Sequence, residues 1–432
     1  MRLLLVGAFP YPHHQGSQIY FQEQALALRT AGAEIELLTY ASGLEPAAHS
    51  RALDGFVHHT PPAWTAPRGL GAGPALGKPL ADLALAMTLR QRLASYCGHD
   101  AYDAILTHNA EALIAASAGR LGLANEAPPI VYCVHTLLGS ELSTYFKFSK
   151  KKAFSSHPEK RSTFRRGIDA LGRGIDRQLA RRADAWIALT HSSHRVMRQS
   201  STRPGQQIAP PIRDPRLDSQ RLDPGKTAQR FGLEPGGFFL YSGNLDGYQE
   251  LEILASTAEL LAQTIADPKE RPVLVVASHD PEGEHRIAQM PGVEFRHVSR
   301  ANEMQALLAS AQANLLMRLA EGGYPIKLAN AHSLGVPSIV FHAREWGLRD
   351  GVNALVATPD RPAASLAGLI LRLAGNAGLA ARLGAGARRV YESEHQPDKV
   401  ANRTLALIEQ VISLRDPFAS SNSPTRRPQS AR

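Results

Sequence analysis

Two hydrophobic patterns alternate along the first half of the chain. Short apolar runs typical of buried β-strands are followed by stretches with apolar residues every three or four positions, which are typical of amphipathic helices. Strands that alternate with helices predict a parallel sheet covered on both faces. The predicted strands are Leu3–Val6, Ile35–Thr39, Ala104–Thr107, Ile130–Val134 and Ala185–Leu189, and the predicted helices are Ser17–Ala31, Asp82–Ser95, Ala110–Leu121 and Ile168–Arg182.

The same alternation starts again after a proline-rich break. Four prolines and a glycine interrupt the pattern between Arg203 and Pro215, where we place an interdomain linker. The sequence therefore predicts an α/β protein with two Rossmann-like domains. The second series has predicted strands at Phe238–Ser242, Val273–Ala277, Val293–His297, Ala313–Met317 and Ser338–Phe341 and predicted helices at Leu251–Ile265, Asn302–Ala311, Pro325–Leu334 and Ala363–Ala374.

The domain limits follow from these two series. We expect an N-terminal domain over residues 1–204 and a C-terminal domain over residues 205–397. A helical pattern continues to about Leu414, and we expect the helix at 398–416 to pack back on the N-terminal domain. Residues 417–432 are polar and are expected to form a disordered tail.

Composition excludes several classes of protein. Apolar residues make up 44% of the chain and charged residues 20%, as in soluble globular proteins. Cys97 and Cys133 have no metal-like spacing, which fits a reducing compartment. No apolar run reaches the roughly 18 residues of a membrane-spanning helix, and the first apolar run is too short for a signal peptide. We therefore expect a cytoplasmic protein.

The positive charge is concentrated in one segment. Residues 147–182 hold twelve Lys or Arg and three Asp or Glu, and twelve minus three equals the net charge of +9 of the whole chain. One local basic patch suits an anionic membrane, an anionic acceptor or nucleic acid, and a solvated loop and helix explains it equally well.

Loops that leave the carboxyl ends of parallel strands are where α/β proteins bind ligands. Gly16 and Ser17 begin the first predicted helix, where free amides suit a phosphate or a glycosyl oxygen; Ser17 is also a candidate N-cap. His108 and His135 lie at strand ends, where a neutral imidazole can hydrogen-bond a sugar hydroxyl. Each of these residues also has an ordinary structural interpretation, as a turn, a cap or a core histidine.

The second half contributes two further loops. Asn244 and Gln249 follow a strand in a loop with two glycines and offer neutral amide donors. The segment Glu321–Asn330 leads from a strand into a helix, and Gly322 and Gly323 expose amides at the helix N-terminus, which is an anion site.

Charged and polar side chains complete that anion site. Arg318 and Lys327 add positive charge, and Asn330 lies one helical turn further, within reach of a ribose diol. The chain has no Asp-x-Asp, the paired carboxylates with which one class of nucleotide-sugar enzymes binds a divalent cation. We therefore expect no metal and no cofactor besides a nucleotide-sugar co-substrate.

Together these loops resemble those of the retaining GT-B glycosyltransferases of family 4, over about residues 1–395. In that family a glycine-rich first loop, a strand-end histidine, an Arg and Lys pair and two spaced glutamates form the site. The corresponding places are Gly16 with Ser17, His135, Asn244 with Gln249, and the segment from Gly322 to Asn330. The chain departs from the pattern: two amides replace the cations, Asn330 replaces the second glutamate, and Glu321 lies one residue out of register with the first.

The resemblance implies two Rossmann-like domains that face each other across a cleft. It implies a metal-independent bacterial enzyme of cell-envelope polysaccharide biosynthesis, which moves a sugar from a nucleoside-diphosphate donor to a surface-glycan or lipid-linked acceptor with retention of configuration. His135 and Glu321 would orient the sugar. The donor would be bound by Gly16, Ser17, Asn244, Gln249, Arg318, Gly322, Gly323, Tyr324, Pro325, Lys327 and Asn330.

Other interpretations stay open. The missing glutamate and cations also fit a catalytically silent GT-B scaffold that acts as a binding or assembly partner. A GT-B sugar-nucleotide epimerase matches the loops less well. Nucleic acid is not an expected partner, because the basic segment lacks a recognised reading motif. Residues 147–182 are a candidate for peripheral contact with an anionic membrane.

Overall fold

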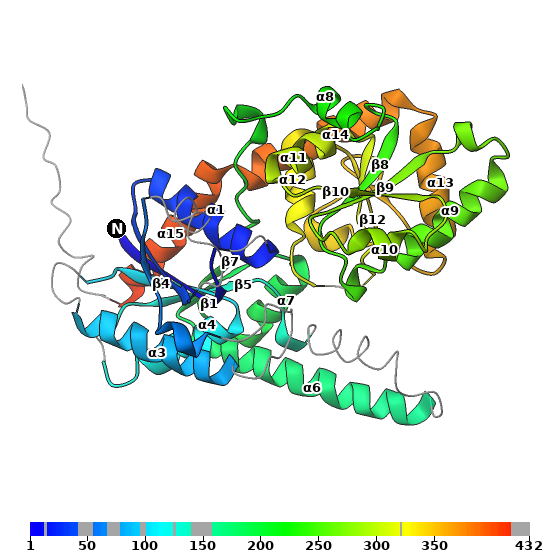
Figure 1. The fold of residues 1–432 in the computed structure, drawn as a ribbon. Helices are drawn as coiled ribbons and strands as arrows, with labels where there is room; N and C mark the ends of the chain where they lie inside the picture. The colour runs from blue at the N-terminus through cyan, green and yellow to red at the C-terminus, as the bar shows by residue number, and fades with distance from the viewer. Residues whose placement is uncertain are drawn as a thin grey trace, which may run out of the picture.

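The computed structural model describes residues 1–12, 15–41, 55–66, 78–95, 101–123, 127–139, 158–319 and 322–415. They form two domains, each a parallel sheet flanked by helices, and the predicted class of two Rossmann-like domains is confirmed (Figure 1). The predicted tail at 417–432 lies outside the described residues, and so does Cys97.

The first domain is built on a seven-stranded sheet in the order β3-β2-β1-β4-β5-β6-β7, with parallel pairing throughout. The short edge strands β3 and β7 were not predicted because their three residues are mostly polar. Since β7 pairs with β6, the domain boundary expected at residue 204 is too early. The strands are β1 Arg2–Pro10, β2 Glu34–Tyr40, β3 Val57–His59, β4 Ala104–His108, β5 Ile130–Val134, β6 Ala185–Ala188 and β7 Gly205–Gln207.

Helices cover both faces of this sheet. α3, α4 and α6 bury leucines against one face, including Leu85, Leu113 and Leu179. α1 packs on the other face, and it begins at Gly16 with Gln15 as its N-cap and no capping side chain. Ser17 is exposed, so its predicted role as the N-cap is wrong. The helices are α1 Gly16–Thr30, α3 Lys78–Ser95, α4 Ala110–Gly119, α6 Pro158–Arg182 and α7 His191–Ser200.

The second domain has a six-stranded parallel sheet in the order β10-β9-β8-β11-β12-β13. Its central strand β8 is buried along its whole length. α12 follows Pro325 and ends at Gly335 with a φ of 70°, the proline and glycine punctuation that the sequence predicted. The strands are β8 Phe238–Ser242, β9 Val273–Ser278, β10 Val293–His297, β11 Ala313–Leu315, β12 Ser338–Val340 and β13 Leu355–Val356; the helices are α8 Pro224–Arg230, α9 Glu252–Thr264, α10 Gly283–Ile287, α11 Ala301–Ser310, α12 Ile326–Leu334, α13 Pro362–Ala374 and α14 Ala377–Val390.

The chain crosses between the domains twice. The first crossing follows β7, and the second runs through a π-helical turn, Tyr391–His395, into α15, Pro397–Arg415. The amide of Ile212 in the first crossing donates to the carbonyl of His395 in the second, at 3.0 Å. The two crossings are therefore hydrogen-bonded to each other.

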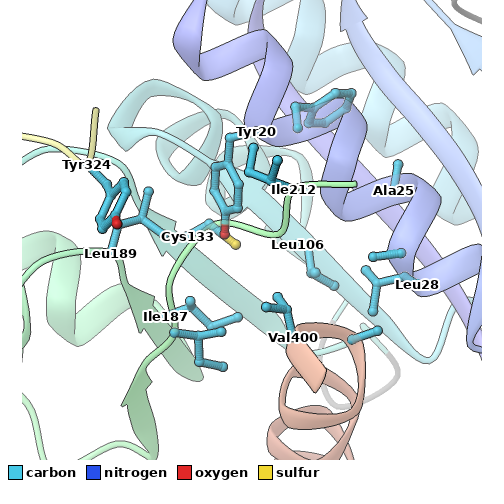
Figure 2. Packing of buried hydrophobic residues seen from close by; sticks show 14 of the residues in the cluster. Tyr20, Ala25, Leu28, Leu106, Cys133, Ile187, Leu189, Ile212, Tyr324 and Val400 are labelled. Carbon is cyan, nitrogen blue, oxygen red and sulfur yellow. The ribbon is translucent and has the colours of Figure 1, made fainter. Parts of the chain in front are cut away.

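α15 returns to the first domain and packs on α1 (Figure 1). Its apolar residues, Val400 and Leu407 among them, are buried in the same core cluster as Leu28 and Ile187 (Figure 2). Among the described residues, no single helix is long and apolar enough to cross a membrane; only α13 together with Ala377–Arg415 reaches that length, across a bend of 105°.

Candidate functional site

Loops from the carboxyl ends of both sheets meet between the domains. A Cβ atom added to Gly323, just before α12, would lie 2.5 Å from the carbonyl oxygen of His135, just after β5. At the start of α1, a Cβ atom on Gly16 would lie 3.6 Å from the side chain of Ile326. The structure therefore brings the predicted positions Gly16, His135 and Gly323 into one neighbourhood.

Two imidazoles form the first-domain side of this neighbourhood. Because β4 and β5 are adjacent, His108 at the end of β4 and His135 just after β5 lie side by side, with 2.9 Å between Nδ1 of His108 and Nε2 of His135. Tyr20 of α1 packs its ring against both, at centroid distances of 5.1 and 4.9 Å.

Both imidazoles are neutral near pH 7. Burial lowers the pKa of His135 to about 3, and burial together with His135 holds the pKa of His108 well below its ordinary value. The pair can therefore offer a hydrogen bond to an uncharged hydroxyl, but it does not carry a positive charge toward a phosphate.

Lys327 forms the second-domain side, in the first turn of α12. Its ammonium nitrogen is buried and makes no hydrogen bond to a described residue. It lies 3.9 Å from the ring centroid of Tyr241 and faces Gly243, where an added Cβ would lie 3.2 Å away. Burial, and to a lesser degree the charge of Arg318, lowers the pKa of Lys327 to about 7, against an opposing effect of Asp246. An ammonium held in this way is stabilised by any anion that enters.

Arg318 lies beside Lys327 and over a glycine. Its guanidinium occupies the space where a Cβ of Gly322 would stand, so only glycine fits at that position without movement of the arginine. Two cations and the amides at the start of α12 thus converge on one loop, which is the arrangement that an anion site needs.

The loop after β8 is held together by its own amides. Nε2 of Gln249 donates to Oδ1 of Asn244 at 2.9 Å, and Nδ2 of Asn244 donates to Asp246 at 2.6 Å. The Tyr241 hydroxyl donates to the carbonyl of Asn244 at 2.5 Å. These hydrogen bonds stabilise the loop beneath Lys327, and donor binding by Asn244 and Gln249 stays a prediction.

The other predicted donor ligands lie in different surroundings. Tyr324 is buried and its hydroxyl bonds to His395, and donor binding by Tyr324 stays a prediction. Pro325 is the N-cap of α12, and Asn330 is half-buried one turn beyond Lys327. Glu321, the second predicted catalytic residue, lies outside the described residues.

Sequence reasoning missed Tyr241 as a part of this site. Tyr241 is the penultimate residue of the buried strand β8, and its place under Lys327 follows from no spacing in the chain. His108 was recognised as a strand-end histidine, and the adjacency of β4 and β5 makes it the partner of His135. Within the described ranges, no three His, Cys, Asp or Glu side chains gather as a metal site would require.

Known proteins share the architecture of this chain. Residues 15–211 match the family model described as the glycosyl transferase 4-like domain. The N-terminal domain is therefore similar to that family. No curated protein matches the sequence.

Solved structures extend the likeness to both domains. HepE (Alr3699) of Anabaena, solved in complex with UDP, superposes with a TM-score of 0.65 at 17% identity, over 95% of this chain and 100% of that one. Sucrose-phosphate synthase of Thermosynechococcus elongatus superposes with a TM-score of 0.70 at 15% identity, over 96% of this chain and 99% of that one. WaaG, a glycosyltransferase involved in lipopolysaccharide biosynthesis, superposes with a TM-score of 0.60 at 15% identity, over 92% of this chain and 98% of that one. The chain thus has the GT-B glycosyltransferase fold, and the predicted resemblance is confirmed.

Proposed function

We propose that the protein transfers a glycosyl group from a nucleoside-diphosphate sugar to a surface-glycan or lipid-linked acceptor, with retention of anomeric configuration. The observation that carries the proposal is the buried ammonium of Lys327, which has no hydrogen-bond partner among the described residues and lies at the N-terminal turn of α12. HepE, a protein of the same fold, has been solved with UDP and with UDP-glucose, which supports a nucleotide-sugar donor.

The second domain would bind and stabilise the leaving diphosphate. A negative charge grows on the diphosphate as the glycosidic bond breaks, and fixed positive groups lower the energy of that state. Lys327, Arg318 and the amides around Gly323 would provide them, and Asn330 would bind the ribose. This assignment places the cations after β11, whereas the family resemblance expects them at Asn244 and Gln249 after β8.

The first domain would orient the sugar. His135 is neutral and is held by His108, so it suits a hydroxyl of the donor sugar rather than a phosphate. Glu321 would share this role. In a retaining transfer the acceptor oxygen attacks the face from which the diphosphate leaves, so the diphosphate itself can accept the acceptor's proton, and a separate base is not required.

Calorimetry with UDP and GDP, followed by hydrolysis assays across common nucleotide sugars, tests the proposal. Lys327→Ala should weaken binding of the preferred nucleotide by about 1.5–3 kcal/mol, because a charged hydrogen bond is lost. Lys226→Ala, an exposed lysine of α8 in the same domain, is the matched control and should bind normally. A wild-type protein that binds neither nucleotide would instead favour a silent scaffold.

The acceptor's location motivates a membrane contact, which we propose as part of the same function. α3, α4 and α6 cover the same face of the first sheet, so their outer sides point away from the protein in the same general direction. Leu83 and Met87 of α3 are each 58% exposed, and Arg173 and Arg177 of α6 are exposed. Exposed apolar and basic side chains together suit an anionic bilayer at the cytoplasmic face of a membrane.

Sedimentation with vesicles tests this contact. The protein should bind vesicles rich in phosphatidylglycerol at low salt and not vesicles of phosphatidylcholine. Leu83→Gln with Met87→Gln should reduce binding several-fold, while Leu217→Gln, which changes a leucine 84% exposed in the first crossing, should not. Equal binding by both variants, or none by the wild type at low salt, would remove the membrane from the proposal.

A further inference from the structure

A chain of hydrogen bonds of known direction runs through the boundary between the domains. His395 Nδ1 lies 2.8 Å from the carbonyl oxygen of Pro210, which can only accept, so this nitrogen carries the hydrogen. Burial lowers the pKa of His395 to about 4, so its other ring nitrogen Nε2 is an unprotonated acceptor near pH 7. The Tyr324 hydroxyl, 2.9 Å away, therefore donates to it.

His395 connects both interdomain crossings. Its ring bonds to Pro210 and its backbone carbonyl accepts from Ile212, two residues of the first crossing, while His395 itself ends the second crossing. His332 of α12 lies at 3.5 Å from the same ring nitrogen that accepts from Tyr324. The imidazole is fully enclosed, with 1% of its surface exposed, so its position is determined by the two crossings and by α12.

Tyr324 extends this connection to the candidate donor site. It lies between Gly323, which abuts the His135 carbonyl, and α12, which carries Lys327. Its ring is buried in the core cluster that also contains Leu189 of the first domain (Figure 2). A shift of Tyr324 must therefore move the glycines of the anion site, because they are its chain neighbours.

We propose that Tyr324 and His395 are positioning residues that tie the geometry of the donor loop, residues 322–327, to the relative position of the two domains. A rotation of one domain about the crossings displaces His395, and the hydrogen bond transmits that displacement through Tyr324 to Gly323. The arrangement of the loop therefore depends on how the two domains sit relative to each other. The proposal rests on the proposed function for the statement that the loop binds a nucleotide diphosphate.

Tyr324→Phe tests the proposal with little risk to folding, because it removes one hydroxyl and keeps the ring. Hydrogen exchange of the peptide that covers Gly322–Leu328, measured without nucleotide, should become about threefold to tenfold faster, as expected for the loss of one buried hydrogen bond. Tyr391→Phe is the matched control, since this buried tyrosine lies in the second crossing and packs against Arg388. Its exchange in the donor loop should match that of the wild type.

The second measurement is the affinity for UDP and GDP. Tyr324→Phe should raise the dissociation constant of the preferred nucleotide about threefold to tenfold with little change in melting temperature. Tyr391→Phe should leave the dissociation constant unchanged. His395→Gln, which keeps an acceptor for the tyrosine, should bind better than His395→Leu. Unchanged exchange in Tyr324→Phe, or faster exchange with unchanged affinity, overturns the proposal.

The two proposals fail in different ways. A wild-type protein that binds no nucleotide contradicts the proposed function, and the positioning proposal is then decided by hydrogen exchange alone. Even without nucleotide binding, hydrogen exchange that becomes faster in Tyr324→Phe and not in Tyr391→Phe supports the positioning proposal.

Discussion

The two sides of the candidate site are built from equivalent strand-to-helix steps and differ in their electrostatics. On the first-domain side, His108 and His135 are neutral and share one hydrogen bond. On the second-domain side, Lys327 lies buried with no hydrogen-bond partner among the described residues and has Arg318 nearby. A neutral imidazole pair can be specific for shape and hydroxyl groups, whereas a buried cation without a hydrogen-bond partner gains most from an anion. Under the proposed function, this difference assigns the sugar to the first-domain side and the diphosphate to the second-domain side.

The largest effect should come from the residue where the two sides touch. In Gly323→Ala the new methyl group would meet the His135 carbonyl, a backbone atom that cannot rotate away. The resulting overpacking, about 1–3 kcal/mol, should lower donor hydrolysis by about tenfold to a hundredfold. Gly368→Ala in α13, where an added Cβ meets nothing within 4 Å, is the control and should keep full activity. Normal activity in Gly323→Ala would show that the close approach is not needed for transfer.

Lys327 should make nucleotide affinity depend on pH. Its pKa is about 7 in the empty protein, and a bound diphosphate would raise it. Below pH 7 the lysine is charged in both states and affinity is at its maximum. Above pH 7 the empty site has lost the proton, so affinity should fall, by up to about tenfold per pH unit, until the pKa of the bound state is reached. Calorimetry between pH 6.5 and 8.5 measures this.

Lys327→Met should remove both this pH dependence and the tight binding. Because the folded state lowers the lysine pKa from 10.5, the wild-type protein's unfolding free energy should rise with pH between about 7 and 10.5, and the variant should lose that rise. The variant should also be more stable than the wild type when empty at pH 7, since a buried ammonium has been removed. A steep pH profile that persists in Lys327→Met would assign the titration to another group.

The first-domain side should distinguish nucleotide sugars from free nucleotides. His135→Ala should weaken binding of the donor sugar nucleotide about threefold to tenfold, for the loss of one hydrogen bond, and leave affinity for the free nucleoside diphosphate unchanged. Paired calorimetric titrations measure the two affinities. Lys327→Ala, by contrast, should weaken the affinities for the sugar nucleotide and for the free nucleoside diphosphate equally. If His135→Ala lost affinity equally for the sugar nucleotide and for the free nucleoside diphosphate, the imidazole would contact the diphosphate. Sugar and diphosphate would then not be bound on separate sides of the site.

The smallest effect should come from Ser17. Since its hydroxyl makes no cap for α1, Ser17→Ala should change the unfolding free energy by less than about 0.5 kcal/mol. Asn109→Ala, which removes the side chain that caps α4 at 3.1 Å, should cost about 1 kcal/mol. Thermal unfolding compares the two. A large loss in Ser17→Ala would reveal a contact absent from this structure.

The sequence was sufficient for most of the architecture. β5 and β8 have the predicted bounds, because apolar runs of β-branched and aromatic residues have few alternatives to a buried strand. The proline and glycine at the ends of α12 specify backbone conformations directly, so its limits were predicted within one residue. Gly322, Gly323 and Lys327 lie at this helix N-terminus as expected, since a helix start is a local feature, and donor binding by them stays a prediction.

Features that depend on distant parts of the chain could not be predicted. The polar edge strands β3 and β7 are held by pairing to a neighbour rather than by their own residues. Tyr324 resembles an ordinary loop residue, and its burial against His395 depends on a partner 71 positions away. Likewise, the contact of Gly323 with His135 requires both domains to be in place. Local patterns carry no information about such contacts.

α15 gives the first domain a core that is assembled from both ends of the sequence. Leu28 in α1 and Leu407 in α15 are buried in one cluster, although the whole second domain is synthesised between them. During translation, the apolar face of the first sheet that α15 covers stays open until residues beyond 400 emerge. The first domain is therefore expected to need protection from aggregation for longer than its own length suggests, and a protein cut between the domains should expose that face permanently.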